Sequence, residues 1–272
     1  MSSVLSGSPS DILFLLQTLL VVLLGLAFGS FATMMAHRGY IVSKRKSSED
    51  TKTSRSQCPK CSASLGLRDL IPLFSWLFQR GKCRHCKAPI SPVYPAVELA
   101  VLSMGLAYYV MHGFEPVLQL FCVIAASSIL VGLAVFDWRH KILPNQLILV
   151  LALLGVVFRF LPYYEGANIQ PKTIEFLGGA VLYAVLAFIL GWVMKILLKK
   201  PALGMGDVKF FGAAGLWLGI SQLGVFCILS GVLGVALGLA WQYATKQKVF
   251  PFGPALIASF YVVLLLNGSH LP

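Results

Sequence analysis

Two aspartates lie at the edges of apolar segments, where an ionisable side chain is costly unless it serves a function. Asp137 follows an apolar run that ends in Val135 and Phe136, and Asp207 precedes a run that begins at Val208. Two carboxylates that share one site do not easily both ionise, so one keeps a proton and the other does not. One carboxylate can then take a proton from water while the other polarises a carbonyl group, which is the chemistry of aspartic proteolysis.

Each aspartate also has a structural interpretation. Asp137 is followed by Arg139 and Lys141, either of which would pair with it, and Asp207 would cap the N-terminus of a helix beside Lys209. Composition and spacing alone leave the catalytic and the structural interpretations open.

Two glycines precede the second aspartate. Gly204 and Gly206 have no side chain, so the backbone of a substrate could approach closely there. We therefore expect Gly204, Gly206 and Lys209 to support the two carboxylates.

Four cysteines form a second constellation, in Cys58-Pro-Lys-Cys61 and Cys83-Arg-His-Cys86. Two such pairs can supply four thiolates to one tetrahedral Zn²⁺ ion, and four protein ligands leave no open position for catalysis. We therefore expect a structural zinc site, which would stabilise a domain of roughly 35 residues that is too small to be stable on its core alone. A redox-active pair of cysteines is the alternative interpretation. His85, which lies between Cys83 and Cys86, is not expected to bind the metal.

The composition places most of the chain in a membrane. Of the 272 residues, 57% are hydrophobic and 12% are charged, whereas a soluble domain carries about 25% charged residues. Helices satisfy their own backbone hydrogen bonds in lipid, so we expect an all-α polytopic membrane protein with about eight transmembrane helices and a small cytoplasmic zinc-binding insertion. The predicted spans are 12–36, 94–111, 117–136, 145–161, 174–194, 208–220, 222–243 and 252–267.

The first of these spans is expected to stay in the mature chain. The first ten residues contain no Lys or Arg, so they lack the basic segment of a cleaved signal peptide. Cys122 and Cys227 fall within spans, where they are expected to pack in the core.

The basic residues orient the spans. The net charge is +12, and 20 of the 22 Lys and Arg residues fall in alternate loops, with only Arg159 and Lys172 near the opposite side. Because basic residues collect in cytoplasmic loops, residues 37–92 are expected in the cytoplasm and both termini outside. The same asymmetry explains the positive charge without a nucleic-acid partner.

This topology divides the chain into three predicted parts. Residues 1–36 form the first transmembrane helix, 37–92 a cytoplasmic loop with the four-cysteine zinc module, and 93–272 a helical bundle that carries the aspartates. Within the loop, the polar segment 41–56 is expected to be a flexible linker.

Seven glycines in the region 208–243 are expected to let helices pack closely. They are Gly212, Gly215, Gly219, Gly224, Gly231, Gly234 and Gly238.

Eight short motifs occur in an order that resembles the prepilin peptidases, or type IV leader peptidases, of pilus, type II secretion and competence systems. The resemblance covers nearly the whole chain after residue 28. The motifs are Gly29-Ser30-Phe31, Cys58-Pro59-x-Cys61, Ile71-Pro72-Leu73-Phe74-Ser75-Trp76-Leu77, Arg80-Gly81-Lys82-Cys83-x-x-Cys86, Tyr94-Pro95-x-Val97-Glu98, Asp137 with Pro144-Asn145, Gly204-Met205-Gly206-Asp207-Val208-Lys209, and Pro251-Phe252-Gly253-Pro254.

The resemblance implies a GxGD-type aspartic protease with Asp137 and Asp207 as its pair. The implied substrates are type IV prepilins or pseudopilins, whose short basic leader is removed at the cytoplasmic face of the bacterial inner membrane. The resemblance further implies that the new N-terminus is methylated with S-adenosylmethionine, with Gly81 as the main methyltransferase candidate and Lys82 and Glu98 as weaker ones.

One departure and two alternatives remain. The family usually has Asn at the position of Thr33, so an amide is replaced by a hydroxyl near the methyltransferase motifs. A peptidase without methylation is the first alternative, although the intact cysteine pairs and Gly81 argue against it. The second is a membrane transporter or assembly scaffold with a structural zinc module, which leaves the ordered motifs unexplained.

Overall fold

The structure is a computed structural model that describes residues 9–44, 57–58, 60–69, 71–114, 116–160, 170–199, 203–247 and 249–267. These residues form helices, turns and two isolated β-bridges, and contain no strand, which confirms the predicted all-α class. The described helices are, in chain order, α1 (Pro9–Lys44), η1 (Leu67–Asp69), α2 (Phe74–Phe78), α3 (Val93–His112), α4 (Val117–His140), α5 (Asn145–Phe160), α6 (Gln170–Leu198), α7 (Met205–Leu218), η3 (Ile220–Gln222), α8 (Leu223–Thr245) and α9 (Gly253–Asn267).

Each of the eight predicted spans coincides with one helix, namely α1 or one of α3 to α9. Five segments are long and apolar enough to cross a membrane: Ser10–Met35, Val93–His112, Val117–His140, Thr173–Leu197 and Ile220–Thr245. The apolar helices α5 and α9 are shorter, and α7 has 14 residues. A helix of that length rises about 21 Å, less than the roughly 30 Å of the hydrocarbon core.

The chain divides into two compact units, Met1–Val110 and Met111–Pro272. In the first unit, α1 packs closely against α3, because a Cβ atom on Gly29 would lie 2.7 Å from the Cα of Glu98. One turn earlier, a Cβ on Gly25 would lie 3.1 Å from the Cα of Leu102. Glycines on α1 therefore let the two backbones approach in this unit, a common device in membrane helix pairs.

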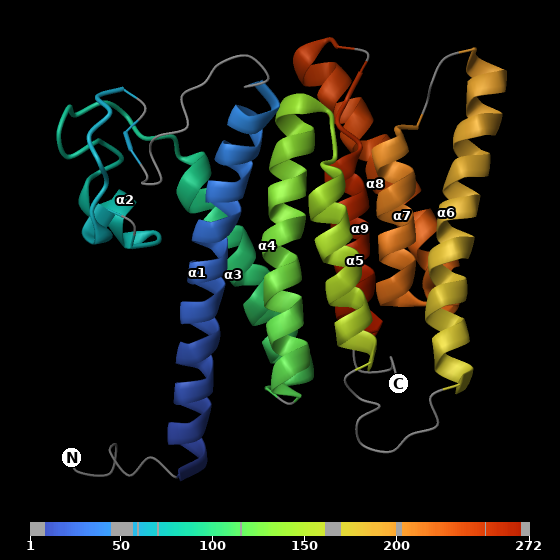
Figure 1. Ribbon diagram of the computed structural model, residues 1–272, viewed down its shortest axis with the longest axis horizontal. Coiled ribbons are helices and arrows are strands. Elements are labelled where there is room, and N and C mark those ends of the chain that lie inside the picture. Colours follow the sequence, from blue (N-terminus) through green and yellow to red (C-terminus); the bar gives the residue numbers. More distant parts are fainter. Residues whose placement is uncertain are drawn as a thin grey trace. The chain divides into compact units, whose positions relative to one another are not determined.

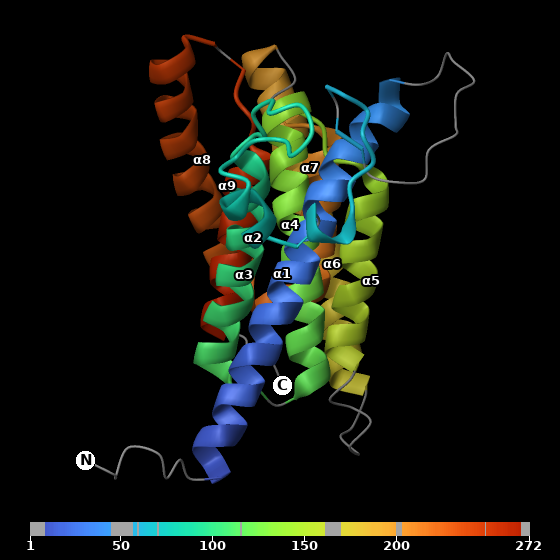
Figure 2. The same cartoon turned by 90° about the vertical axis from the view of Figure 1, so that its left-hand side faces the viewer.

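The second unit is a bundle of α4 to α9, whose helices run side by side (Figure 1). The short helix α7 packs against α5, α6 and α9, and α8 pairs with α9 (Figure 2). Beyond Lys209 no side chain of α7 is exposed. The helix is therefore enclosed by its neighbours.

Small residues make this enclosure possible. A Cβ on Gly215 of α7 would lie 2.5 Å from the carbonyl oxygen of Gly179 on α6, so the two backbones are in direct contact. On the α5 side, the space in front of Gly155 is filled by the indole of Trp217, whose Nε1 donates to the Leu151 carbonyl at 2.8 Å. Interlocked packing of this kind fixes the position of a helix without polar side chains.

The C-terminal end of α7 has a charged partner inside the bundle. Arg159 of α5 is 3% exposed, donates to the carbonyl of Trp217 and lies with its Cζ 4.4 Å from the ring centre of Phe176. A cation at a helix C-terminus neutralises the partial negative charge of the last carbonyl groups. Arg159, which the charge count placed near the non-cytoplasmic side, is therefore a buried helix residue with a structural contact.

The prediction for the seven glycines holds for part of the set. Gly212 and Gly215 adjoin α6, while Gly234 and Gly238 adjoin the aromatic rings of Phe252 and Phe250. Gly219 has a φ of +75° and ends α7. Gly224 and Gly231 have nothing within 4 Å of a Cβ position, so close packing does not explain them.

Two smaller predictions concern the loop and the isolated cysteines. Helix α1 continues through Lys44, so the first four residues of the predicted linker 41–56 are helical, and residues 45–56 lie outside the described residues. The linker prediction was wrong for 41–44 because the helical pattern of α1 extends past its apolar part.

Cys122 is buried in α4 and Cys227 is half-buried in α8, as expected of packing residues.

Candidate active site

Asp137 lies in the last turn of α4, with 6% of its surface exposed. The helix ends three residues later at His140, and the next residue, Lys141, adopts the left-handed conformation (φ 54°) and donates its backbone N–H to the Asp137 carbonyl at 2.8 Å. A left-handed residue after a helix is a common terminator, because it turns the chain back towards the last carbonyls. The last turn of α4 thus carries a buried carboxylate, although the residues that follow Asp137 are exposed or half-buried.

The Asp137 carboxylate contacts the beginning of α9. Its Oδ2 accepts a hydrogen bond from the backbone N–H of Gly253 at 2.7 Å, and a Cβ atom at Gly253 would lie at the same distance from that oxygen. Gly253 is the first residue of α9, whose N–H has no partner inside the helix. A glycine is required here, since any side chain would displace the carboxylate.

Asp207 lies in the first turn of α7 and is half-buried. Its Oδ2 accepts the backbone N–H of Gly204 at 3.0 Å, which is one half of a capping box; Gly204 has no side chain to supply the other half. The structural interpretation of Asp207 as a helix cap is therefore confirmed. The same hydrogen bond fixes the orientation of the Asp207 carboxylate. The contact is therefore also compatible with a catalytic role.

The bundle brings the two aspartates near each other. The Asp137 carboxylate is close enough for its charge to act on Asp207, and the helices that carry the site meet where Phe210 of α7 packs edge-on against Phe260 of α9, with ring centres 6.0 Å apart. Within the described residues, the second oxygen of each carboxyl accepts no hydrogen bond. One oxygen of each of the two carboxyl groups is thus positioned by a backbone N–H.

The neighbouring cations make other contacts. Lys141 donates to the Val249 carbonyl at 2.9 Å, and Lys209 donates to Oδ1 of Asn145 at the start of α5, also at 2.9 Å. Among the residues that the structure describes, no ion pair joins Asp137 to Arg139 or Lys141. The carboxylate of Asp137 takes a backbone partner on α9 instead, and the charge of Lys141 acts on it from beyond ion-pair distance.

The two glycines of the Gly204–Asp207 turn face protein groups. A Cβ on Gly206 would lie 3.1 Å from the Cβ of Leu143, in the loop that follows α4, and one on Gly204 would lie 3.2 Å from Oδ2 of Asp207. Gly206 therefore lets the α4–α5 loop pack onto the start of α7. This contact brings the loop after Asp137 directly to the turn before Asp207.

The four predicted zinc ligands come together in the first unit. The sulfur atoms of Cys58, Cys61, Cys83 and Cys86 all lie within 4.8 Å of one another, and those of Cys58 and Cys86 are 3.9 Å apart. Tetrahedral coordination with Zn–S bonds of 2.3 Å requires sulfurs about 3.8 Å apart, so the arrangement fits the ion. Hydrogen bonds from the backbone of Cys61 and Lys60 lower the pKa of Cys58 to about 6, whereas burial and hydrogen bonds with the other cysteines raise the pKa of Cys61 to about 11. Without a metal, Cys58 is therefore the thiol that ionises more readily.

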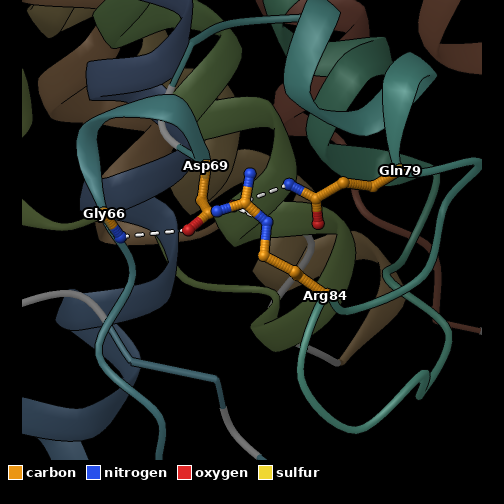
Figure 3. A network of polar contacts seen from close by, with 4 residues as sticks. All are labelled: Gly66, Asp69, Gln79 and Arg84. Atoms are coloured by element: carbon orange, nitrogen blue, oxygen red, sulfur yellow. Dashed lines mark hydrogen bonds and ion pairs between the residues drawn. The ribbon is translucent and has the colours of Figure 1, made fainter.

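A polar network joins Gly66 and Asp69, which follow the first cysteine pair, to Gln79 and to Arg84, which lies within the second pair (Figure 3). Asp69 accepts hydrogen bonds from the Gly66 backbone at 3.0 Å and from the Gln79 amide at 2.9 Å, and forms an ion pair with Arg84 at 3.8 Å. The Asp69 side chain is 6% exposed. Its network ties the segment after the first pair to the second pair, alongside the metal cluster.

The three methyltransferase candidates have separate surroundings in the same unit. Gly81 is buried with a φ of +67°, and a Cβ there would lie 3.0 Å from the ring of Trp76. Glu98 is buried on α3 and accepts the backbone N–H of Leu73 at 2.7 Å. Lys82 is exposed. Gly81 thus contacts the middle of α2, Glu98 contacts the residue just before α2, and Lys82 is exposed.

Sequence reasoning missed three contributors. Gly253 entered the sequence analysis only as part of a motif. A Gly-Pro pair at the start of an apolar helix does indicate that the glycine N–H lacks a partner within the helix and that another group can approach it closely. Asn145 likewise anchors Lys209, and Asp69 organises the cysteine module. Nothing in the sequence indicated the role of Asp69, except that it is an isolated acidic residue in a basic loop.

Comparison with known proteins identifies relatives along most of the chain. Residues 123–239 match the Type IV leader peptidase family, and residues 23–112 match the Bacterial Peptidase A24 N-terminal domain. The prepilin leader peptidase/N-methyltransferase of Aeromonas hydrophila is 32% identical over 92% of this chain and 91% of the relative. That of Pectobacterium carotovorum subsp. carotovorum is 30% identical over 91% and 92%, respectively.

A third relative carries a different name. The type 4 prepilin-like proteins leader peptide-processing enzyme of Escherichia coli O78:H11 is 33% identical over 89% of this chain and 92% of the relative. No solved structure matches the chain.

The geometry of the cysteine cluster predicts one zinc ion per chain in the purified protein. Replacement of Cys58 by Ser removes one of four thiolates, so we expect metal content to fall to a small fraction of an equivalent, measured by elemental mass spectrometry. The matched control is Cys122→Ser, which changes a cysteine outside the cluster and should keep the full equivalent. Retention of a full equivalent by Cys58→Ser would show that the metal binds elsewhere.

Proposed function

The chain belongs to the type IV leader peptidase family, and we propose that Asp137 and Asp207 are its catalytic pair. The activity that this membership carries is removal of the leader peptide from prepilins, followed by N-methylation of the new N-terminus. The single observation that supports the assignment of the pair is the placement of both carboxylates at adjoining helix ends, each with one oxygen fixed by a backbone N–H.

The proposed reaction uses the two free carboxyl oxygens. One carboxylate accepts a proton from a water molecule, whose oxygen attacks the carbonyl carbon of the scissile peptide bond. The protonated partner donates a hydrogen bond to the carbonyl oxygen, which gains charge in the transition state. The proton taken from water then passes to the leaving nitrogen as the carbon–nitrogen bond breaks, so the pair returns to its starting state.

The contacts around the pair act as positioning elements in this scheme. Gly253 directs Oδ2 of Asp137 away from the substrate, and the Gly204 N–H does the same for Asp207. Gly206 and Lys209 support the pair indirectly, through Leu143 and Asn145. A pair held from the backbone does not need to be reoriented when a substrate arrives.

The proposed topology has all eight apolar helices in the bacterial inner membrane, with residues 37–92 in the cytoplasm and both termini outside. The distribution of 20 of the 22 Lys and Arg residues supports this orientation. The helical insertion 37–92 then acts as one domain between the first helix, residues 1–36, and the bundle of residues 93–272. The pair lies at the cytoplasmic edge, where the leader of a prepilin or pseudopilin would be exposed while its apolar helix stays in lipid.

We assign the methylation step to the cysteine module and its contact with α3. The zinc ion is structural in this scheme, and S-adenosylmethionine would supply the methyl group, which passes to the free amine of the cleaved product with loss of a proton. Gly81, Glu98 and, less directly, Lys82 are the candidate residues of this chain. Thr33 does not replace the amide of the usual Asn, because its hydroxyl donates to the Ser30 carbonyl of its own helix at 2.7 Å.

The alternative of a transporter or assembly scaffold is not favoured. It assigns no role to the Asp137–Gly253 contact, and relatives that share 30–33% of their residues with this chain are named as processing enzymes. The peptidase and methyltransferase activities account for the aspartates and the cysteine module together.

The proposed pair predicts that Asp137→Asn and Asp207→Asn each abolish leader removal in reconstituted vesicles. An amide cannot take the proton from water, and loss of general acid–base catalysis costs about 10²–10⁴-fold in rate. Cleavage is measured as the shift of prepilin to the mature form on a gel. Asp11→Asn, an exposed aspartate at the start of α1, is the control and should cleave normally. If either site variant still processes prepilin at the normal rate, the pair is wrongly assigned.

The contact at the start of α9 predicts that Gly253→Ala slows cleavage without unfolding the protein. The added Cβ would lie 2.7 Å from Oδ2 of Asp137, and displacement of a catalytic group by about 1 Å costs on the order of 100-fold in rate. The prepilin gel shift is followed over time. Gly231→Ala adds the same methyl group where nothing lies within 4 Å and should cleave at the normal rate. Equal rates for both variants would remove Gly253 from the site.

The surroundings of Gly81 predict a separation of the two activities in Gly81→Ala. The new Cβ would press on Trp76 at 3.0 Å in a left-handed conformation that alanine disfavours, so the module is distorted while the aspartates are not. We expect a mature pilin whose N-terminal amine lacks the methyl group, detected as a loss of about 14 Da by mass spectrometry. Gly66→Ala, where the nearest atom is 3.6 Å away, is the control within the module. Full methylation by Gly81→Ala would contradict the assignment.

A further inference from the structure

Helix α2 of the cysteine module exposes an apolar face. Ile71 is 47% exposed, Phe74 50%, Leu77 65% and Phe78 81%, and no residue of α2 is buried. The rings of Phe74 and Phe78 stack with their centres 6.4 Å apart. Three of these side chains lie on α2 and the fourth, Ile71, lies three residues before it; together they are here called the α2 apolar face, and exposed apolar clusters mark interaction sites.

The face is presented by a rigid support. The Trp76 indole donates to the Ile90 carbonyl at 3.2 Å and covers Gly81, so this side chain holds the module from within. Leu73, just before α2, has a φ of +58° and donates its N–H to Glu98. These contacts hold the segment on both sides of Phe74, with the four apolar side chains exposed.

The same contacts set the depth of α2 along a membrane helix. Glu98 lies five residues after the start of α3 at Val93, which corresponds to about 8 Å of helix rise. Segment Val93–His112 is long and apolar enough to cross a membrane. The hydrogen bond from Leu73 to Glu98 therefore places α2 beside the first turns of a membrane-crossing helix, at the level where Tyr94 provides an interfacial ring.

The charge around the face selects its partner. Residues 57–92 contain six Lys and Arg residues and one acidic residue, Asp69, which is already paired with Arg84. A basic segment with exposed aromatic and aliphatic side chains has the composition of an element that lies in the surface of an anionic bilayer. The basic leader of a prepilin would be repelled by the same charges.

We propose that the α2 apolar face inserts into the cytoplasmic leaflet among anionic lipid headgroups and so fixes the cysteine module on the membrane surface. The occupant is lipid, since both the depth set by Glu98 and the positive charge fit it. This anchoring holds the module at the height at which a prepilin helix leaves the bilayer. The inference does not depend on which residues catalyse cleavage.

The test places a photo-crosslinking amino acid, p-benzoylphenylalanine, at Phe78 or at Leu77 of the full-length protein. The protein is reconstituted in vesicles of phosphatidylethanolamine and phosphatidylglycerol, with prepilin present, and irradiated. Mass spectrometry of the peptides identifies what the probe has captured. We expect lipid adducts at both positions, with a several-fold lower yield in vesicles of phosphatidylcholine alone, which lack the anionic headgroups.

The control carries the same amino acid at Lys60, an exposed position in the first cysteine pair, and should give several-fold less lipid adduct than Phe78. Retention of zinc by each protein shows that the module is folded. Adducts of Phe78 and Leu77 with prepilin instead of lipid, or yields equal to that at Lys60, would overturn the proposal. Since the readout is capture and not cleavage, a failure here is distinct from a failure of the aspartate pair.

Discussion

A buried carboxylate at the end of a membrane helix requires a hydrogen-bond donor, and the rest of the bundle is arranged around how Asp137 obtains one. The donor is the N–H of Gly253, which the start of α9 leaves without an intrahelical partner. For the contact to form, α9 must begin where α4 ends, so the chain between α8 and α9 returns to that level, where Lys141 also binds the Val249 carbonyl. The two contacts together join the end of α4 to the start of α9 and to the segment before it.

Helix α7 supplies the second carboxylate under a different constraint. It is too short to reach from one membrane face to the other and is enclosed by α5, α6 and α9. Its N-terminal turn is closed by Asp207 itself and covered by Leu143, and its C-terminal carbonyl at Trp217 receives Arg159. Both ends of the helix are therefore satisfied by protein groups, as a helix end inside a membrane requires.

Much of this arrangement follows from the sequence. The apolar runs located eight of the described helices, because a helix satisfies its own backbone hydrogen bonds among apolar side chains. The spacing of the cysteines located the candidate metal cluster, because four thiolates satisfy a tetrahedral ion. The partner of Asp137 did not follow, since nothing in a one-dimensional pattern distinguishes a nearby lysine from a backbone N–H 116 residues away. The role of Gly206 was misjudged for the same reason: an absent side chain signals a close approach but does not identify what approaches.

The enclosure of α7 has a consequence for how the protein responds to its bilayer. Helices in contact with lipid tilt or shift when the hydrocarbon layer becomes thicker or thinner, and each ångström of mismatch costs a fraction of a kcal/mol. Helix α6 exposes many large apolar side chains and takes up such adjustments, whereas α7 exposes none beyond Lys209. The height of the Asp207 carboxyl is consequently set by protein packing and insulated from changes in lipid composition.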